Sequence, residues 1–162
     1  MKKEDFKFLF DTYFDAIKNY IFYRVGDIDI ATDIAQDVFV RVWEKQMQLD
    51  LKNAKYLLYK IAKDMLVSKY RKFEVEAKYN NRMQLELTEL VVDNHYDYKQ
   101  LQNSYQQALV QLPEKQRTVF MMSRMEELKY TEIAERLDIS IKTVEKRMSN
   151  ALSYLRKALK YG

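Results

Sequence analysis

The fold of this chain is decided by the stretch Leu128-Lys-Tyr-Thr-Glu-Ile-Ala-Glu-Arg-Leu-Asp-Ile-Ser-Ile-Lys-Thr-Val-Glu-Lys-Arg147. Its first half has the apolar spacing of a helix, with Ile133, Ala134 and Leu137 on one face. A tight turn is expected next, at Asp138-Ile139-Ser140. The apolar series then resumes at helical spacing with Val144, Met148, Ala151, Leu152 and Leu155. The stretch therefore predicts a helix, a turn and a second helix.

The second of these helices has a polar and basic face opposite its apolar stripe. With about 100° between successive residues, the positions that point away from the core are Lys142, Thr143, Lys146, Arg147 and Asn150. Side chains of these types reach base edges and phosphates in the major groove of DNA. This helix is therefore a candidate recognition helix. The alternative is a solvated face on a three-helix bundle.

The composition favours long helices over sheets. Among 162 residues there are only two glycines and one proline, while Lys, Glu, Gln, Leu and Met are plentiful. Apolar residues make up 48% of the chain, enough for one domain of typical size or two small ones, and we expect an all-α fold.

The absence of cysteine excludes disulfides and thiolate metal sites. No apolar run approaches about 18 residues, so we expect a soluble cytoplasmic protein.

Charge is distributed in blocks along the chain. Residues 1–50 carry seven Lys and Arg against ten Asp and Glu, whereas residues 51–82 carry nine against three. Residues 83–112 are again acidic, with one against four, and residues 113–162 are basic, with eleven against seven. Two basic blocks separated by an acidic one suggest two surfaces that face a polyanion. The acidic N-terminal block is free to face another partner.

An early helix carries an acidic face around apolar side chains. It follows the Gly26-Asp27 turn, with Asp29 as a possible N-cap, and buries the series Ala31, Ile34, Ala35, Val38 and Val42. Its opposite face carries Asp33, Gln36, Val40 and Glu44, with Asp37 and Trp43 on the flanks. An acidic rim around an apolar anchor is typical of a protein-binding surface. The alternative is that the tryptophan packs against another helix.

The next helix, near residues 54–72, combines cations with aromatic rings. Its inward positions are Leu57, Leu58, Ile61 and Met65, and its outer face collects Tyr56, Tyr59, Lys60, Lys63, Tyr70 and Arg71. Cations that follow phosphates and rings that stack on unpaired bases are what single-stranded DNA binding needs. The alternative is that the tyrosines cover a neighbouring helix while the lysine head groups stay in water.

Periodicity weakens from about residue 74 to residue 98, which we interpret as a linker. The linker contains the only histidine, His95, which has no ligand set nearby. A second module then begins with Leu101 to Leu112, and Pro113 is placed to open the following helix at its first position.

Taken together, the motifs resemble those of a known family. They are Asp33-Ile-Ala-Gln-Asp-Val-Phe-Val-Arg-Val-Trp-Glu44, Tyr56-Leu-Leu-Tyr-Lys-Ile-Ala-Lys-Asp64, Leu112-Pro-Glu-Lys-Gln-Arg-Thr-Val-Phe120, Tyr130-Thr-Glu-Ile-Ala-Glu-Arg-Leu137 and Ser140-Ile-Lys-Thr-Val-Glu-Lys-Arg147. In this order and in a chain of this size, they resemble the extracytoplasmic-function (ECF) sigma factors of the sigma-70 family. A lone helix-turn-helix would fit many regulators.

The resemblance implies two small helical domains, at residues 1–74 and 99–162, joined by a linker at 75–98. The first domain would bind core RNA polymerase through Asp33, Gln36, Asp37, Val40, Trp43 and Glu44. It would open and read the -10 promoter element with the loop near residues 46–55 and with Lys55, Tyr56, Tyr59, Lys60, Lys63, Tyr70 and Arg71. The second domain would read the -35 element with Ser140, Lys142, Thr143, Lys146, Arg147 and Asn150.

The same resemblance implies no catalytic activity and no cofactor. The expected partners are core RNA polymerase, promoter DNA and an anti-sigma factor, with no metal and no direct membrane insertion. In the free chain, we expect the two domains to sample many separations, and the acidic N-terminal block to pair with the basic C-terminal one.

Four positions depart from the family pattern, and two of them are Asp64 and Ser68, where the family often has Asn and Asp. ECF sequences usually have glycine where this chain has Glu127 and Asp138. Asp tolerates a left-handed backbone, so the turn at Asp138 should survive, whereas Glu127 tolerates it less well and predicts a different connection.

Two other classes of function stay open. A stand-alone helix-turn-helix regulator would leave the acidic face and the tyrosine-rich helix without a role. An enzyme is disfavoured, because the sequence has no nucleophile, metal-ligand or phosphate-loop constellation.

Overall fold

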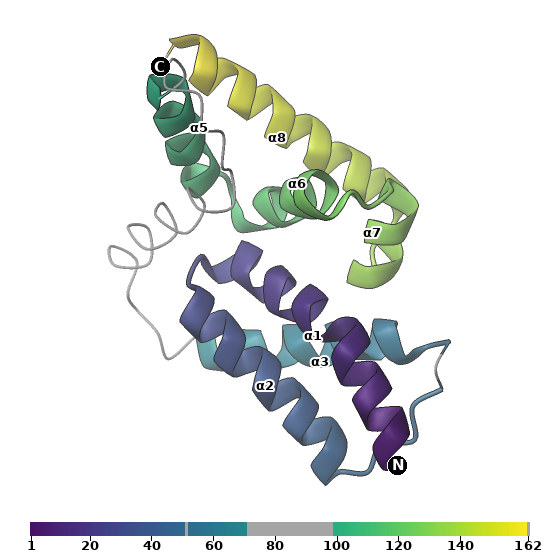
Figure 1. Ribbon diagram of the computed structural model, residues 1–162. Coiled ribbons are helices and arrows are strands. Elements are labelled where there is room, and N and C mark those ends of the chain that lie inside the picture. The colour runs from purple at the N-terminus through teal and green to yellow at the C-terminus, as the bar shows by residue number, and fades with distance from the viewer. Residues whose placement is uncertain (51, 71–98, 162) are drawn as a thin grey trace.

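The computed structural model describes residues 1–50, 52–70 and 99–161, and these residues form helices joined by short connections. Figure 1 shows two groups of helices, which have the following bounds: α1 Lys3–Val25, α2 Ile28–Glu44 and α3 Ala54–Tyr70 in the first group, and α5 Lys99–Gln111, α6 Glu114–Glu126, α7 Tyr130–Leu137 and α8 Ile141–Tyr161 in the second. The all-α prediction is confirmed. The predicted linker at 75–98, His95 and Arg71 lie outside the described residues.

The turn between α1 and α2 reverses the chain within two residues. Gly26 ends α1 with φ 75°, a left-handed conformation that glycine adopts without a Cβ clash. Asp27 is the N-cap of α2, because its carboxylate accepts hydrogen bonds from the backbone N–H groups of Asp29 at 2.9 Å and Ile30 at 3.2 Å. The prediction that Asp29 caps this helix is therefore wrong by two residues. The carboxylate two positions earlier is the one that reaches the free N–H groups.

The core of the first group lies between α1, α2 and α3. All five residues of the predicted α2 stripe are buried: Ala31, Ile34, Ala35, Val38 and Val42. Phe39 extends this core toward α1, with its ring 5.3 Å from that of Phe10 and 6.0 Å from that of Phe14. The aromatic contacts fix α2 against the N-terminal half of α1.

In the second group, two non-glycine residues in the left-handed region make the helical connections. Pro113 is the N-cap of α6, so the proline stands one position before the helix rather than at its first residue as predicted. Glu127 ends α6 with φ 54°, and Asp138 ends α7 with φ 56°. The expectation that Glu127 would require a different geometry is wrong. The left-handed cap is retained, at the steric cost that a Cβ adds there.

The two groups pack directly on each other. In Figure 1, α1 lies beneath α6, and α3 contacts α7. Buried apolar residues of both groups belong to one continuous cluster. The described conformation is therefore closed. That the free chain also samples other separations of its two domains stays a prediction.

Candidate nucleic-acid interface

The predicted recognition helix is α8, and its geometry follows from the cap at Ser140. The Ser140 hydroxyl accepts a hydrogen bond of 3.1 Å from the backbone N–H of Thr143 and lies 2.8 Å from the Thr143 hydroxyl. One turn further on, Val144 is fully buried and fixes the rotation of the helix. Lys142, Lys146 and Asn150 are exposed, while Thr143 and Arg147 are half-buried. The structure thus places the predicted polar face on one exposed side of α8.

The tyrosine-rich face of α3 is only partly as predicted. Tyr59 is 2% exposed, and its ring packs edge-on against Tyr20 with the ring centres 5.2 Å apart. Arg136 of α7 donates a hydrogen bond of 3.2 Å to the Tyr59 hydroxyl. Burial raises the pKa of Tyr59 to about 12. The prediction that Tyr59 faces outward is wrong in this conformation, because α1 and α7 close over it.

The remaining described residues of that face lie at the surface. Lys60 and Lys63 are exposed, and Lys55 and Tyr56 are half-buried. A hydrogen bond with the Asp138 carboxylate is the main cause that raises the pKa of Tyr56. Tyr56 therefore contacts the turn of the helix-turn-helix. The side chain of Tyr70 and the whole of Arg71 lie outside the described residues.

The predicted partner face of α2 is exposed, with two exceptions. Asp33, Gln36 and Glu44 are exposed, and Val40 is 49% exposed. Asp37 forms an ion pair with Lys69 of α3, and Trp43 packs its ring 5.1 Å from that of Phe6. Asp37 and Trp43, the two flanking residues of this face, therefore contact neighbouring helices, as the packing alternative expects for the tryptophan. The central positions remain available to a partner.

Sequence reasoning missed Arg117, a buried charged residue that contacts both groups. Arg117 is 2% exposed and donates hydrogen bonds to the carbonyls of Tyr23 and Arg24 at the end of α1, both at 2.8 Å. It also donates to the carbonyls of Val110 at 3.3 Å and Leu112 at 3.1 Å, at the end of α5. One guanidinium thus binds the carboxyl ends of two helices, where carbonyl groups lack helical partners.

Two further polar contacts of α1 cross the same boundary. Arg24 of α1 forms an ion pair with Glu114 of α6, and Asn19 donates a 3.4 Å hydrogen bond to Glu126. Burial raises the pKa of Glu126. In the Arg24–Glu114 pair the cation comes from the first group and the carboxylate from the second. The charge blocks led us to expect the reverse, with carboxylates of the N-terminal block pairing with cations of the C-terminal block. The individual residues at the contact, and not the net charge of each block, determine which pair forms.

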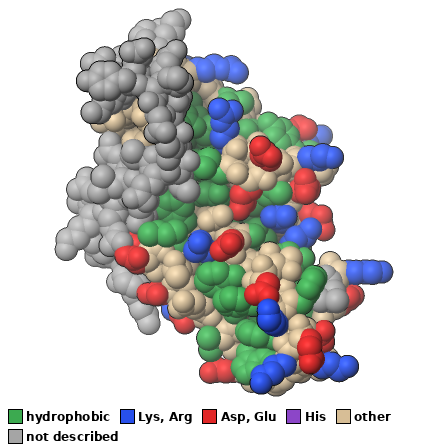
Figure 2. All heavy atoms as spheres, viewed as in Figure 1, with side chains coloured by type: hydrophobic (Ala, Val, Ile, Leu, Met, Phe, Trp, Pro, Cys, Tyr) green, Lys and Arg blue, Asp and Glu red, His purple; other side chains and the backbone are tan. Residues whose placement is uncertain are grey.

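Charged residues are dispersed over the surface. Figure 2 shows basic and acidic side chains interspersed on the viewed face of the described part of the chain, over both groups of helices. On this face, the described cations are not gathered into one continuous basic stripe.

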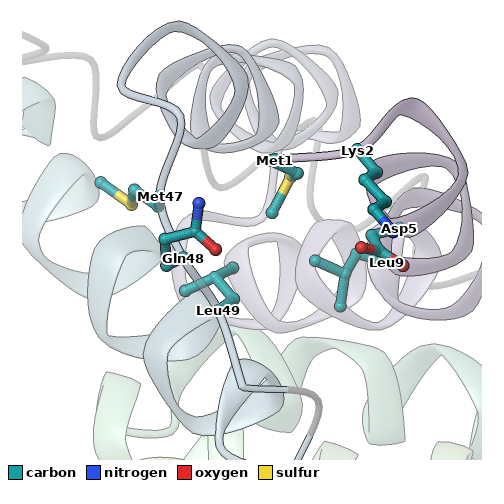
Figure 3. A pocket seen from close by; sticks show the side chains of 7 residues that line it. All are labelled: Met1, Lys2, Asp5, Leu9, Met47, Gln48 and Leu49. Carbon is teal, nitrogen blue, oxygen red and sulfur yellow. The ribbon is translucent and has the colours of Figure 1, made fainter.

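A pocket lies beside the loop that precedes α3. Figure 3 shows Met47, Gln48 and Leu49 of this loop facing the N-terminal end of α1 across a hollow. The pocket has a volume of about 390 Å³, and Met1, Lys2, Asp5 and Leu9 complete its lining. The amino terminus of Met1 donates a 2.8 Å hydrogen bond to Gln46, which holds this end of the chain against the loop. Its lining combines four apolar side chains with the polar side chains of Lys2, Asp5 and Gln48.

Comparisons with known proteins agree with this geometry. Residues 102–155 match the family model described as Sigma-70, region 4. The chain is 30% identical to the ECF RNA polymerase sigma factor SigW of Bacillus subtilis, and the match covers 99% of this chain and 93% of that protein. It is 28% identical to the ferric citrate uptake sigma factor FecI of Escherichia coli, with coverages of 97% and 92%.

A solved structure shows the same fold. It is the sigma factor RpoE in complex with the anti-sigma factor NepR from Bartonella quintana, with a TM-score of 0.61 and 23% identity. The match covers 97% of this chain and 98% of that chain. With a helix-turn-helix at the family-model match and a relative of this identity along nearly its whole length, the chain belongs to the ECF sigma factors of RNA polymerase.

Proposed function

We propose that this sigma factor directs core RNA polymerase to promoters through three separate surfaces. In this proposal α8 reads the -35 element, α3 with the loop before it opens and reads the -10 element, and the outer face of α2 binds the core enzyme. The observation that carries the proposal is the exposed polar face of α8, with Lys142, Lys146 and Asn150 opposite the buried Val144. The protein then acts by positioning the polymerase and has no catalytic step of its own.

The proposed -10 site combines α3 with the pocket at its N-terminal end. Lys60 and Lys63 would follow the backbone of an unpaired strand, and Tyr56 would stack on a base. The pocket between the loop and α1 has room for one base that has left the stack. Tyr59 joins this surface only after α7 has moved away, since Arg136 now covers its hydroxyl.

The closed conformation leads to a proposal for the role of core polymerase. Tyr56 and Tyr59 of the -10 surface both contact the second group of helices, through Asp138 and Arg136 respectively. The two DNA surfaces are thus held together at a fixed short separation. Core polymerase would separate the domains and hold them at promoter spacing, so that both elements are bound at once.

The proposal extends to the cellular location of the protein and to its regulation. No helix in the described part of the chain is long and apolar enough to span a membrane, and we expect the protein to work in the cytoplasm, where the polymerase is. Since the similar RpoE was solved with an anti-sigma factor, we propose that this chain too is regulated by such a partner.

The first prediction concerns strand opening. We expect Tyr56→Ala with Lys63→Ala to impair promoter opening while leaving duplex capture largely intact, because stacking contributes about 1 to 3 kcal/mol per base. Permanganate reactivity of thymines in the -10 region measures opening, and filter retention of the closed complex measures capture. Normal thymine reactivity in the double variant would contradict the prediction and would mean that these α3 side chains only pack against neighbouring helices.

The second prediction concerns the core-binding face. We expect Asp33→Lys with Glu44→Lys to weaken binding to core polymerase by about tenfold or more, through loss of electrostatic complementarity with a basic surface. Both residues are exposed, so the fold should be retained. The matched control is Glu4→Lys with Asp15→Lys, which makes the same change in charge at exposed positions of α1. Equal losses of affinity in the two double variants would remove the α2 face from the interface.

A further inference from the structure

A small pocket between the two groups of helices is lined by four cations. Arg24 comes from α1, Lys63 from α3, Lys115 from α6 and Arg147 from α8. Tyr20, Thr118, Leu137 and Ile139 complete the lining, and the volume is about 110 Å³. Among the described residues, no acidic side chain lines this pocket. Four helices that are far apart in the sequence thus bring their cations to one place.

Most of this positive charge is not neutralised within the described residues. Arg24 forms an ion pair with Glu114 and bonds the Tyr20 hydroxyl at 3.0 Å. Lys63, Lys115 and Arg147 form no ion pair with a carboxylate in the described ranges. Of the acids outside the lining, Asp64 acts on the charge of Tyr20, and Asp138 bonds Tyr56. An excess of converging cations raises the local potential and favours a bound anion.

The chemistry of the lining selects the kind of anion. Lysine ammonium groups and an arginine guanidinium offer several donors to one oxygen-rich group, as phosphate recognition requires. The volume exceeds by a few times the ~30 Å³ that one water takes in the liquid, so a compact group fits. Three cations without acidic partners match the charge of a diphosphate better than that of a carboxylate.

We propose that this pocket binds a diphosphate group, which bridges the two domains and holds the chain closed. The inference rests on the proposed function, because Lys63 belongs to the -10 surface and Arg147 to the -35 surface. A diphosphate bound to both would compete with promoter phosphates at each. If it binds the closed form alone, the equilibrium shifts toward that form by the factor 1 + [L]/Kd, or about tenfold at ten times Kd.

The test is calorimetric titration of the full-length chain with inorganic pyrophosphate, in the absence of polymerase and DNA. Lys115 is the variant site of choice, because it is exposed and lies outside both proposed DNA surfaces. We expect Lys115→Ala to weaken binding by about tenfold, which corresponds to one charge-assisted hydrogen bond. The matched control is Lys157→Ala, an exposed lysine of α8 away from the pocket, which should leave Kd unchanged. Absence of binding, or equal Kd values in the two variants, would overturn the proposal.

Two further ligands distinguish the possible sources of the group. Adenosine diphosphate that binds more tightly than pyrophosphate would indicate a nucleotide, and the reverse order would indicate the inorganic anion; either result supports a diphosphate site. Sulfate that binds as tightly as pyrophosphate would overturn it, because the pocket would then accept any anion. Since these titrations use the free chain, their failure leaves the proposed transcriptional function untouched.

Discussion

Replacing Arg117 with alanine is expected to destabilise the protein by about 3 to 5 kcal/mol, a larger loss than any other single substitution considered. The side chain is buried and binds the carbonyls of Tyr23, Arg24, Val110 and Leu112. Alanine would leave these acceptors without their donor in an interface that water reaches poorly. The substitution should weaken both the second group of helices, which contains Val110 and Leu112, and its contact with α1, which contains Tyr23 and Arg24.

Denaturant unfolding followed by circular dichroism measures this loss. Arg117→Lys should recover only part of it, because an ammonium keeps the charge but cannot reproduce the planar fork that reaches two helix ends. Arg156→Ala is the matched control, since Arg156 is an exposed arginine on α8. A loss below about 1 kcal/mol in Arg117→Ala, the size typical of a surface site, would show that this contact does not hold the two groups together.

The second large effect is expected at the recognition helix. Lys146→Ala and Arg147→Ala should each weaken promoter binding by about 1 to 3 kcal/mol if the contact is to a base, or lower the salt slope by about one if it is to a phosphate. Combined in one chain, the two changes should reduce transcription from a cognate promoter by roughly a hundredfold. The loss should be confined to promoters that depend on the -35 element.

Transcription on paired templates separates these outcomes. One template carries an intact -35 element, and the other carries a scrambled one. Arg156→Ala again serves as the control, because Arg156 is exposed on α8 and lies more than two turns beyond Arg147 along the helix. Equal activity of the double alanine variant and the control on the intact template would mean that the recognition face has been placed on the wrong side of α8.

Local patterns in the sequence predicted most of the helices and their buried faces. The α2 stripe from Ala31 to Val42 and the α8 stripe from Val144 to Leu155 follow directly from helical spacing, since one face must be buried. The exposed positions Lys142, Lys146 and Asn150 follow from the same spacing. Asp138 was correctly expected to tolerate a left-handed turn, with φ 56°.

Contacts between distant parts of the chain could not be predicted in the same way. Tyr59 has the periodicity of an outward position on α3, and only the approach of α1 and α7 buries it. Arg117 gives no sign in its own segment that it binds carbonyls of α1, because those partners lie more than 90 residues away along the chain. Glu127 shows that tertiary packing can hold an unfavoured residue in the left-handed region.

The most direct test of the central claim is transcription of fragmented genomic DNA by core RNA polymerase from the source bacterium, with and without this protein, followed by mapping of transcript 5′ ends. The account predicts that the protein binds core enzyme and that new start sites appear only in its presence. Those sites should share one -35 and one -10 sequence at constant spacing. The account would be contradicted if the protein failed to bind core and produced no new start sites, while the free chain bound duplex DNA tightly and specifically, as a stand-alone regulator would.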